Sequence, residues 1–301
     1  MFLKIEKKFI DLPNKERIAY VEKGAGDKVI LLIHGNFSSS YHYEPLYKNI
    51  PEDYRVLALD LRGYGDSSYN NKIESIHDFA DDVYMFLQAL NISEAYVVGW
   101  SLGGCVAQSL TARYPSVTKK LILISSGSVK GYPVFKKDAS FQNMIGKIYE
   151  TKEELALDPV TVVPMVTCQA TKNYKFMESI WNMTIYTSTS QKRPDEESSQ
   201  VFLEETCKQV NLVDADWALM RYNISNETSF YSHGENLAKN IVCPVLALNG
   251  KQDITTPEVM TSENRQYIPH IIQKYYEDCG HSILVDQPEA LIKDVLEFVE
   301  R

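Results

Sequence analysis

The chain has 301 residues, of which 44% are apolar and 24% charged, an ordinary globular composition that is long enough to bury a sizeable core. Its formal net charge of -9 argues against binding to phosphate backbones or anionic membranes, which needs clusters of Lys and Arg. The 5 cysteines are scattered and predict neither a disulfide framework nor a zinc site. No apolar run reaches the ~18 residues of a membrane span, and the N-terminus has no signal-like apolar stretch. We therefore expect a cytoplasmic protein that binds neither nucleic acid nor membranes.

Short β-branched runs alternate with amphipathic stretches along the chain, which predicts an α/β fold with a mostly parallel central sheet flanked by helices. Residues 3–10 and 17–21 are expected to form an opening hairpin. Continuously apolar runs then predict buried strands at 29–33, 55–59, 95–98, 121–124 and 245–248, with a weaker last strand at 273–276. Helices are predicted after Ser75, from Ser101 to Pro115, and from Pro288 to the C-terminus.

Between residues 126 and 242 this alternation ends, and aromatic residues become frequent. We expect a mainly helical cap at 128–240, inserted into a core formed by 1–127 and 241–301, with an exposed polar loop at 187–200. The aromatic rings of the cap either line a pocket over the active site or form the cap's own core, and the sequence leaves both possibilities open. The rings in question are Tyr132, Phe135, Phe141, Trp181 and Trp217.

The strongest local motif is Gly99-Trp100-Ser101-Leu102-Gly103, where the strand 95–98 gives way to a helix. A serine that projects from such a sharp turn needs small neighbours two positions to either side, because strand and helix approach closely there. The pattern alone also fits a glycine-rich helix start, but the strand-turn-helix context favours a nucleophile. We therefore predict that Ser101 is the nucleophile and that Gly99, Trp100 and Gly103 shape its turn.

Two further motifs follow earlier strands. His34-Gly35-Asn36-Phe37 comes after the first buried strand, where its loop can aim a backbone N–H at a developing oxyanion, and residues 60–67 follow the next strand. The order of the three motifs resembles the alpha/beta-hydrolase superfamily, in particular its cap-bearing, esterase-like members. The resemblance covers about residues 21–115 and 242–301.

This resemblance implies an acid after a late strand and a histidine after the last strand, in the chain order Ser, Asp, His. Asp253 and His281 stand at those two positions. The chemistry needs both, because a serine hydroxyl is a weak nucleophile until a base takes its proton, and the base needs a carboxylate to fix its tautomer. Asp278, three residues before His281, is the rival acid and is expected to be a loop or surface charge.

The resemblance also implies an oxyanion hole made by the backbone N–H groups of Leu102 and Phe37, with Asn36 as the alternative to Phe37. His34, Gly35 and Asn36 would form the supporting loop. Asp60 and Arg62 are expected to hold neighbouring loops together. The remaining histidines are expected to be solvated or structural: His42, His77, His233 and His270.

The implied function is hydrolysis of a carboxylic ester, thioester or lactone through an acyl-enzyme on Ser101, with a small-molecule acyl substrate and no metal or cofactor. A serine at this position excludes the aspartate-nucleophile chemistry of the dehalogenase and epoxide-hydrolase relatives. One alternative is a carbon–carbon bond hydrolase of a vinylogous diketone, which would need a basic or polar pocket for a dicarboxylate, with Arg221 and Lys175 as candidates. The other is a slow-turnover ligand receptor on the same fold.

Overall fold

The computed structural model describes residues 1–301 except 139, 141, 187–188 and 190. Its strands form one eight-stranded sheet in the order β1-β2-β4-β3-β5-β6-β7-β8. β1 and β2 are antiparallel to their neighbours, and the remaining strands are parallel. The bounds are β1 Lys8–Asp11, β2 Arg17–Lys23, β3 Lys28–Ile33, β4 Tyr54–Leu59, β5 Ala95–Trp100, β6 Thr118–Ile124, β7 Val245–Gly250 and β8 Ile272–Tyr276.

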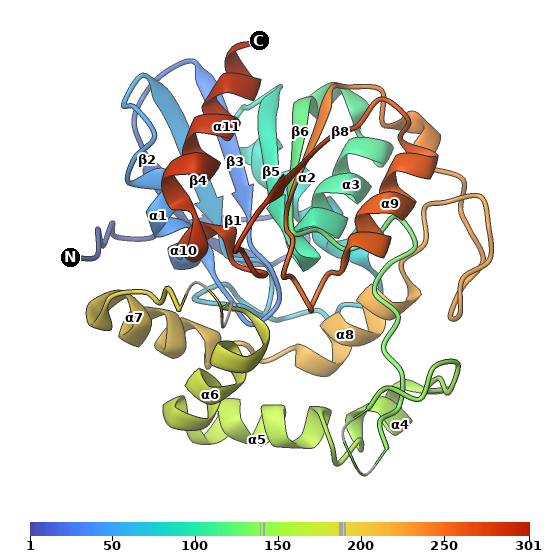
Figure 1. Ribbon diagram of the computed structural model, residues 1–301. Helices are drawn as coiled ribbons and strands as arrows, with labels where there is room; N and C mark the ends of the chain where they lie inside the picture. The colour runs from blue at the N-terminus through green and yellow to red at the C-terminus, as the bar shows by residue number, and fades with distance from the viewer. Residues whose placement is uncertain (139, 141, 187–188, 190) are drawn as a thin grey trace.

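Helices cover both faces of this sheet (Figure 1). The helices of the sheet-forming part are α1 Glu44–Tyr47, α2 Ile76–Ala89, α3 Leu102–Arg113, α9 Glu258–Tyr267, α10 Ile283–Asp286 and α11 Pro288–Glu300. The helices between β6 and β7 are α4 Lys152–Ala156, α5 Val162–Thr171, α6 Tyr174–Thr184, α7 Glu196–Thr206 and α8 Leu212–Arg221. Short 3-10 turns lie at Ser40–Tyr43, Pro115–Val117 and Ala238–Asn240.

Burial on both faces explains why the central strands are continuously apolar. In β3, Leu31 and Ile33 pack with α2 and α3 on one face, whereas Ile30 and Leu32 pack with α1 and α11 on the other. Successive side chains of a strand point to opposite faces, so a strand between two helical layers needs apolar residues at every position. The α/β fold expected from the sequence is confirmed, and the predicted strands and helices match with shifts of a few residues at their ends.

The opening hairpin is shorter than predicted, because β1 begins at Lys8 and not at residue 3. Before it, side chains rather than ladder hydrogen bonds hold the chain. The Phe2 ring packs edge-on against Tyr41 and Phe202, and the Lys7 ammonium is buried among carboxylates. Long-range contacts of this kind leave no trace in a local strand pattern.

The segment between β6 and β7 lies along one side of the sheet, where α4 to α8 gather (Figure 1). Its ends are part of the main core: Val129, Ile224 and Ala238 are buried in the same cluster as α2 and α3. The division at 128 and 240 therefore stays a prediction. The predicted polar loop at 187–200 is wrong at its end, since α7 begins at Glu196 with Asp195 as its N-cap; residues 187–188 and 190 of that loop lie outside the described residues, as does Phe141.

Within the part of the chain that the structure describes, no helix has both the length and the apolar character needed to cross a bilayer.

Candidate active site

Ser101 occupies a sharp turn between β5 and α3. Its backbone has φ 57° and ψ -121°, a conformation that costs an ordinary L-residue about 1–3 kcal/mol. Hydrogen bonds hold the turn on both sides: the Ser101 N–H donates to the Ile124 carbonyl at 3.0 Å, and the Ser101 carbonyl accepts from the Gly104 N–H at 2.9 Å. Strain of this kind persists only where surrounding structure enforces it, and such positions cluster at active sites.

Glycines make this turn sterically possible. A Cβ on Gly35 would lie 2.9 Å from Ser101 Cβ, one on Gly99 would collide with the Gly103 carbonyl, and one on Gly103 would collide with the Ile33 carbonyl. These distances are shorter than van der Waals contact allows. The small residues around Ser101 thus have a physical cause in the close approach of β3, β5 and α3.

Asp253 and His281 come from the loops after β7 and β8, and their side chains meet. The Asp253 Oδ2 lies 2.9 Å from His281 Nδ1, and both side chains are almost fully buried. A carboxylate only accepts, so Nδ1 carries the proton and the Nε2 of the neutral imidazole keeps a free lone pair. That tautomer is the one a general base needs.

The Asp253 carboxylate is fixed by its own loop. Its Oδ1 accepts from the N–H groups of Thr255 and Thr256 at 2.8 Å each, and its Oδ2 accepts from the Thr256 hydroxyl at 2.6 Å. Burial alone would raise the pKa of Asp253, but the electrostatic interaction with His281 and the hydrogen bonds from His281 and Thr256 outweigh it, so this pKa lies below its ordinary value. The group is therefore ionised at neutral pH. No sequence signal marked Thr256 as its partner.

The His281 backbone is held from two directions. Its carbonyl accepts from the Trp100 indole N–H at 3.1 Å, and its N–H donates to the Ile185 carbonyl at 3.0 Å. Trp100, the residue before Ser101, and the chain after α6 thus position the loop that carries His281. Ser101 and His281 line the same cavity, although no hydrogen bond joins their side chains within the described part of the chain. In unliganded enzymes this contact is often long and tightens only with substrate.

The rival groups lie elsewhere. Asp278 is exposed, where it accepts from the Gln252 amide at 3.2 Å. His42 is buried between the rings of Trp181 and Phe202. Three other histidines have local partners outside the Ser101 cavity: His77 with Ser109 and Glu235, His233 with Thr228, and His270 with the Cys243 carbonyl.

His34 fixes the loop after β3. Its Nε2 accepts from the Leu61 N–H at 3.0 Å, so its Nδ1 is protonated and donates to the Gly35 carbonyl at 2.7 Å. Burial lowers the pKa of His34 to about 4, which keeps the ring neutral. The neighbouring Arg62 forms two 2.6 Å hydrogen bonds to Asp82, which tie its loop to α2.

The two expected oxyanion donors differ in availability. The Leu102 N–H, directly after Ser101, donates to no acceptor in the described part of the chain, and the same is true of the Asn36 N–H. The Phe37 N–H, in contrast, donates to Gln209 Oε1 at 3.1 Å. Of the two alternatives that the sequence left open, Asn36 is the one whose N–H is free for a substrate oxygen.

A cavity of about 220 Å³ opens beside Ser101 and His281. Its walls combine residues of the loop after β3 with apolar and aromatic side chains from the segment between β6 and β7, namely Tyr132, Val134, Trp181, Ile185 and Leu219. Among the predicted cap aromatics, Tyr132 and Trp181 line this cavity and Phe135 lines the adjoining one. Trp217 instead packs with Tyr149 and Leu155. Some of these aromatic rings thus line the cavities, whereas Trp217 belongs to a hydrophobic cluster within the segment.

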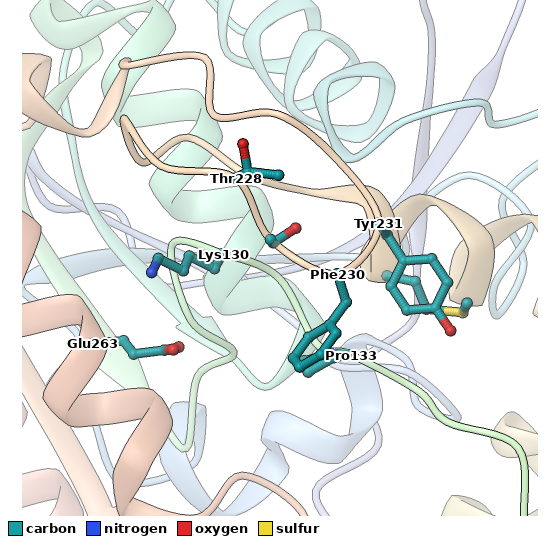
Figure 2. A pocket seen from close by; sticks show the side chains of 8 residues that line it. Lys130, Pro133, Thr228, Phe230, Tyr231 and Glu263 are labelled. Carbon is teal, nitrogen blue, oxygen red and sulfur yellow. The ribbon is translucent and has the colours of Figure 1, made fainter. Parts of the chain in front are cut away.

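A different cavity of about 320 Å³ lies away from these groups. Figure 2 shows Lys130, Pro133, Thr228, Phe230, Tyr231 and Glu263 around it. Neither Ser101 nor His281 contributes to its lining, so it is a separate feature of the surface.

One group of carboxylates has the spacing of a cation site: Asp60, Asp66 and Glu205. The Lys7 ammonium already lies between them, at 2.8 Å from Asp60 and Asp66 and 2.6 Å from Glu205. Burial alone would lower the pKa of Lys7, but the charges of Asp60 and Glu205 raise it above its ordinary value. A protonated lysine thus takes the position that a metal ion would need.

A sequence model described as the alpha/beta hydrolase fold matches residues 28–288. The pig protein named bifunctional epoxide hydrolase 2 is 23% identical over 94% of this chain, which spans about half (53%) of that relative's length. A protein of Pantoea ananatis named putative carbamate hydrolase RutD is 22% identical, over 93% of this chain and 91% of its own.

Solved structures with the same fold include esterases. The esterase EaEST from Exiguobacterium antarcticum superposes with a TM-score of 0.74 at 18% identity, over 98% of this chain and 100% of its own. The enol-lactonase from Burkholderia xenovorans gives 0.70 at 18% identity, over 98% of this chain and 100% of its own. At these identities the structures show the fold, and together with the family match they support a hydrolase.

Proposed function

The chain belongs to the alpha/beta hydrolase fold family, and from that premise we propose that it is a serine hydrolase that cleaves a carboxylic ester, thioester or lactone through an acyl-enzyme on Ser101. The main support is the Asp253–His281 pair, which is joined at 2.9 Å, because its His281 lines the same cavity as Ser101, the residue at the strained turn. A buried, ionised acid that fixes the imidazole tautomer is what nucleophilic catalysis by serine requires.

The reaction proceeds in two halves. Ser101 Oγ attacks the substrate carbonyl carbon as His281 Nε2 takes its proton, and the same proton then goes to the leaving oxygen or sulfur. Water, deprotonated by His281, then attacks the acyl-Ser101 ester; the bond between the acyl carbon and Ser101 Oγ breaks, and His281 returns the proton to Oγ as the acid is released. Asp253 stays ionised throughout and stabilises the imidazolium.

The backbone N–H groups of Leu102 and Asn36 stabilise the tetrahedral oxyanion in this proposal. Asn36 takes the place of Phe37, because the Phe37 N–H is engaged by Gln209. Loss of one such donor typically costs about 10²–10³ in kcat.

The pocket favours ester cleavage over carbon–carbon bond cleavage. Arg221 and Lys175, the candidates for binding a dicarboxylate, line two other cavities. No Lys or Arg is among the described residues that line the cavity beside Ser101, which instead contains the carboxyl of Asp216. Epoxide opening is disfavoured because a serine stands where the family's epoxide hydrolases have their aspartate nucleophile.

Turnover of p-nitrophenyl esters tests this function. Wild-type protein should hydrolyse the acetate and butyrate, with rates falling for long chains such as the decanoate, because the cavity of about 220 Å³ is smaller than the ~300–1,000 Å³ typical of drug-sized sites. The absorbance of the released p-nitrophenolate, followed as a function of acyl-chain length, measures this. Rates equal to buffer on all esters would instead support a receptor.

A matched pair of aromatic truncations provides the control. Tyr132→Ala should open the cavity and raise the rate on hexanoate relative to acetate, since its ring forms part of the wall. Trp217→Ala should leave that preference unchanged and lower stability by about 3–5 kcal/mol, because its ring is buried away from Ser101. An unchanged preference in Tyr132→Ala would contradict the assignment of this cavity to the substrate chain.

A further inference from the structure

Among the described residues that line the Ser101 cavity, Asp216 on α8 carries the one carboxyl. No sequence motif predicted it there. Its Oδ1 accepts from the Asn36 side-chain amide at 2.8 Å. It also lines the adjoining cavity of about 360 Å³, so it lies where the two meet.

A chain of hydrogen bonds fixes the direction of this contact. The Phe37 backbone N–H is an unambiguous donor, so the atom of Gln209 facing it must be its carbonyl oxygen. The Gln209 amino group therefore faces Asn36 and donates to Asn36 Oδ1 at 2.7 Å, which turns the Asn36 amino group toward Asp216. Among the described residues, Asn36 is the hydrogen-bond partner of Asp216, and the second carboxyl oxygen keeps its capacity to accept.

The charge of Asp216 has no counterion in the described cavity walls. The ionisable groups that line the two cavities with it are Tyr132, His281 and, on the outer one, Lys137, and none forms an ion pair with Asp216. Burial raises the pKa of Asp216 to about 7, only partly offset by the Asn36 hydrogen bond. Asp216 is partly exposed, but a carboxylate that is largely removed from water and has a neutral amide as its partner is still costly, and a cationic ligand would offset that cost.

We propose that Asp216 is a specificity residue, which binds a cationic group on the acyl chain of the substrate and rejects acyl chains that carry a carboxylate. The inference rests on the proposed hydrolase function and narrows its substrate class to esters of amino- or ammonium-substituted acids. Attraction to the cation and repulsion of an anion act through the same carboxylate, which is how charged pockets discriminate.

Two isosteric esters test the proposal: p-nitrophenyl 4-(trimethylammonio)butanoate and p-nitrophenyl 5,5-dimethylhexanoate, which differ in one quaternary atom. The measured quantity is the ratio of their kcat/KM values, cationic over neutral, in which intrinsic reactivity cancels between proteins. Asp216→Asn should lower this ratio about tenfold or more at pH 8, the usual range for removing one partner of a desolvated charge pair. Asp278→Asn removes an equal charge from the surface and should leave the ratio unchanged.

The pH dependence adds a readout that a purely structural role would not move. In wild-type protein the ratio should rise between pH 6 and 8 as Asp216 loses its proton, whereas Asp216→Asn and Asp216→Ala should show a flat ratio. A ratio that is the same in wild type and in both Asp216 variants, with the neutral ester turned over, would overturn this inference alone. If wild-type protein hydrolysed p-nitrophenyl acetate or butyrate but neither of these two esters, this inference alone would be overturned. Failure to hydrolyse the acetate and the butyrate as well would overturn the proposed function and this inference with it.

Discussion

Replacing Ser101 by Ala should lower kcat/KM for p-nitrophenyl butyrate by about 10⁴-fold or more, since no other hydroxyl can form the acyl-enzyme at this turn. The fold should survive. The change removes one oxygen atom from a side chain whose neighbours are packed around its backbone, and Ala keeps the Cβ that Gly35 accommodates. The melting temperature should therefore stay close to that of the wild type.

Ser179→Ala is the matched control, because Ser179 is exposed on α6 and, among the described residues, its hydroxyl donates to the Phe176 carbonyl. It should retain wild-type turnover. Kinetics and thermal melts of both variants on the same preparation separate catalysis from folding. A Ser101→Ala protein that keeps a tenth of the wild-type rate would remove Ser101 from the mechanism.

Asp253→Asn should be almost as damaging, with a loss of about 10⁴ in kcat, because an amide in place of the carboxylate allows the wrong imidazole tautomer. In the present structure Asp253 accepts four hydrogen bonds, from Thr255, from both donors of Thr256 and from His281. Each carboxylate oxygen accepts two of these hydrogen bonds and an Asn has only one oxygen, so its amino group must face two of the four donors.

Asp278→Asn is the control for this variant. Asp278 is exposed and has a backbone φ of 47°, a conformation that Asn tolerates as well as Asp. Its activity should stay within about twofold of the wild type, the usual range for a surface charge away from the site. The reverse ranking of the two variants in steady-state kinetics would identify Asp278 as the acid and contradict the geometry described above.

The pH profile of kcat/KM should show no titration of Asp253 in the neutral range. The pKa of Asp253 lies below its ordinary value, so its carboxylate is ionised throughout that range. The depressed pKa of Asp253 also affects stability. The Asp253 carboxylate stabilises the fold above its unfolded pKa, and this contribution is lost as pH falls through the folded value.

Sequence reasoning succeeded where the structural cause is local. Continuous apolar runs mark strands covered on both faces, and the spacing of Gly99 and Gly103 about Ser101 follows from steric contacts within one strand-turn-helix unit. The alternation of strands and helices then places the loops after β5, β7 and β8 at one edge of the sheet, where parallel strands end.

The features that sequence reasoning missed depend on distant contacts. Asp216 meets Asn36 across 180 positions, and Gln209 meets Phe37 across 172. Neither residue belongs to a motif, and their arrangement is set by how α8 and the chain after α7 pack over the loop after β3. Because the Phe37 N–H donates to Gln209, the Asn36 N–H and not that of Phe37 is free in the loop after β3.

Covalent labelling tests the central claim most directly. An alkyl fluorophosphonate gives up fluoride when an activated serine Oγ attacks its phosphorus, and the phosphonyl–serine ester that forms is stable enough for peptide mapping by mass spectrometry. We expect one phosphonyl group per chain, located on Ser101. Labelling should be abolished in Ser101→Ala and strongly slowed in Asp253→Asn. Labelling of a different residue, or equal labelling of the Ser101→Ala protein, would contradict it.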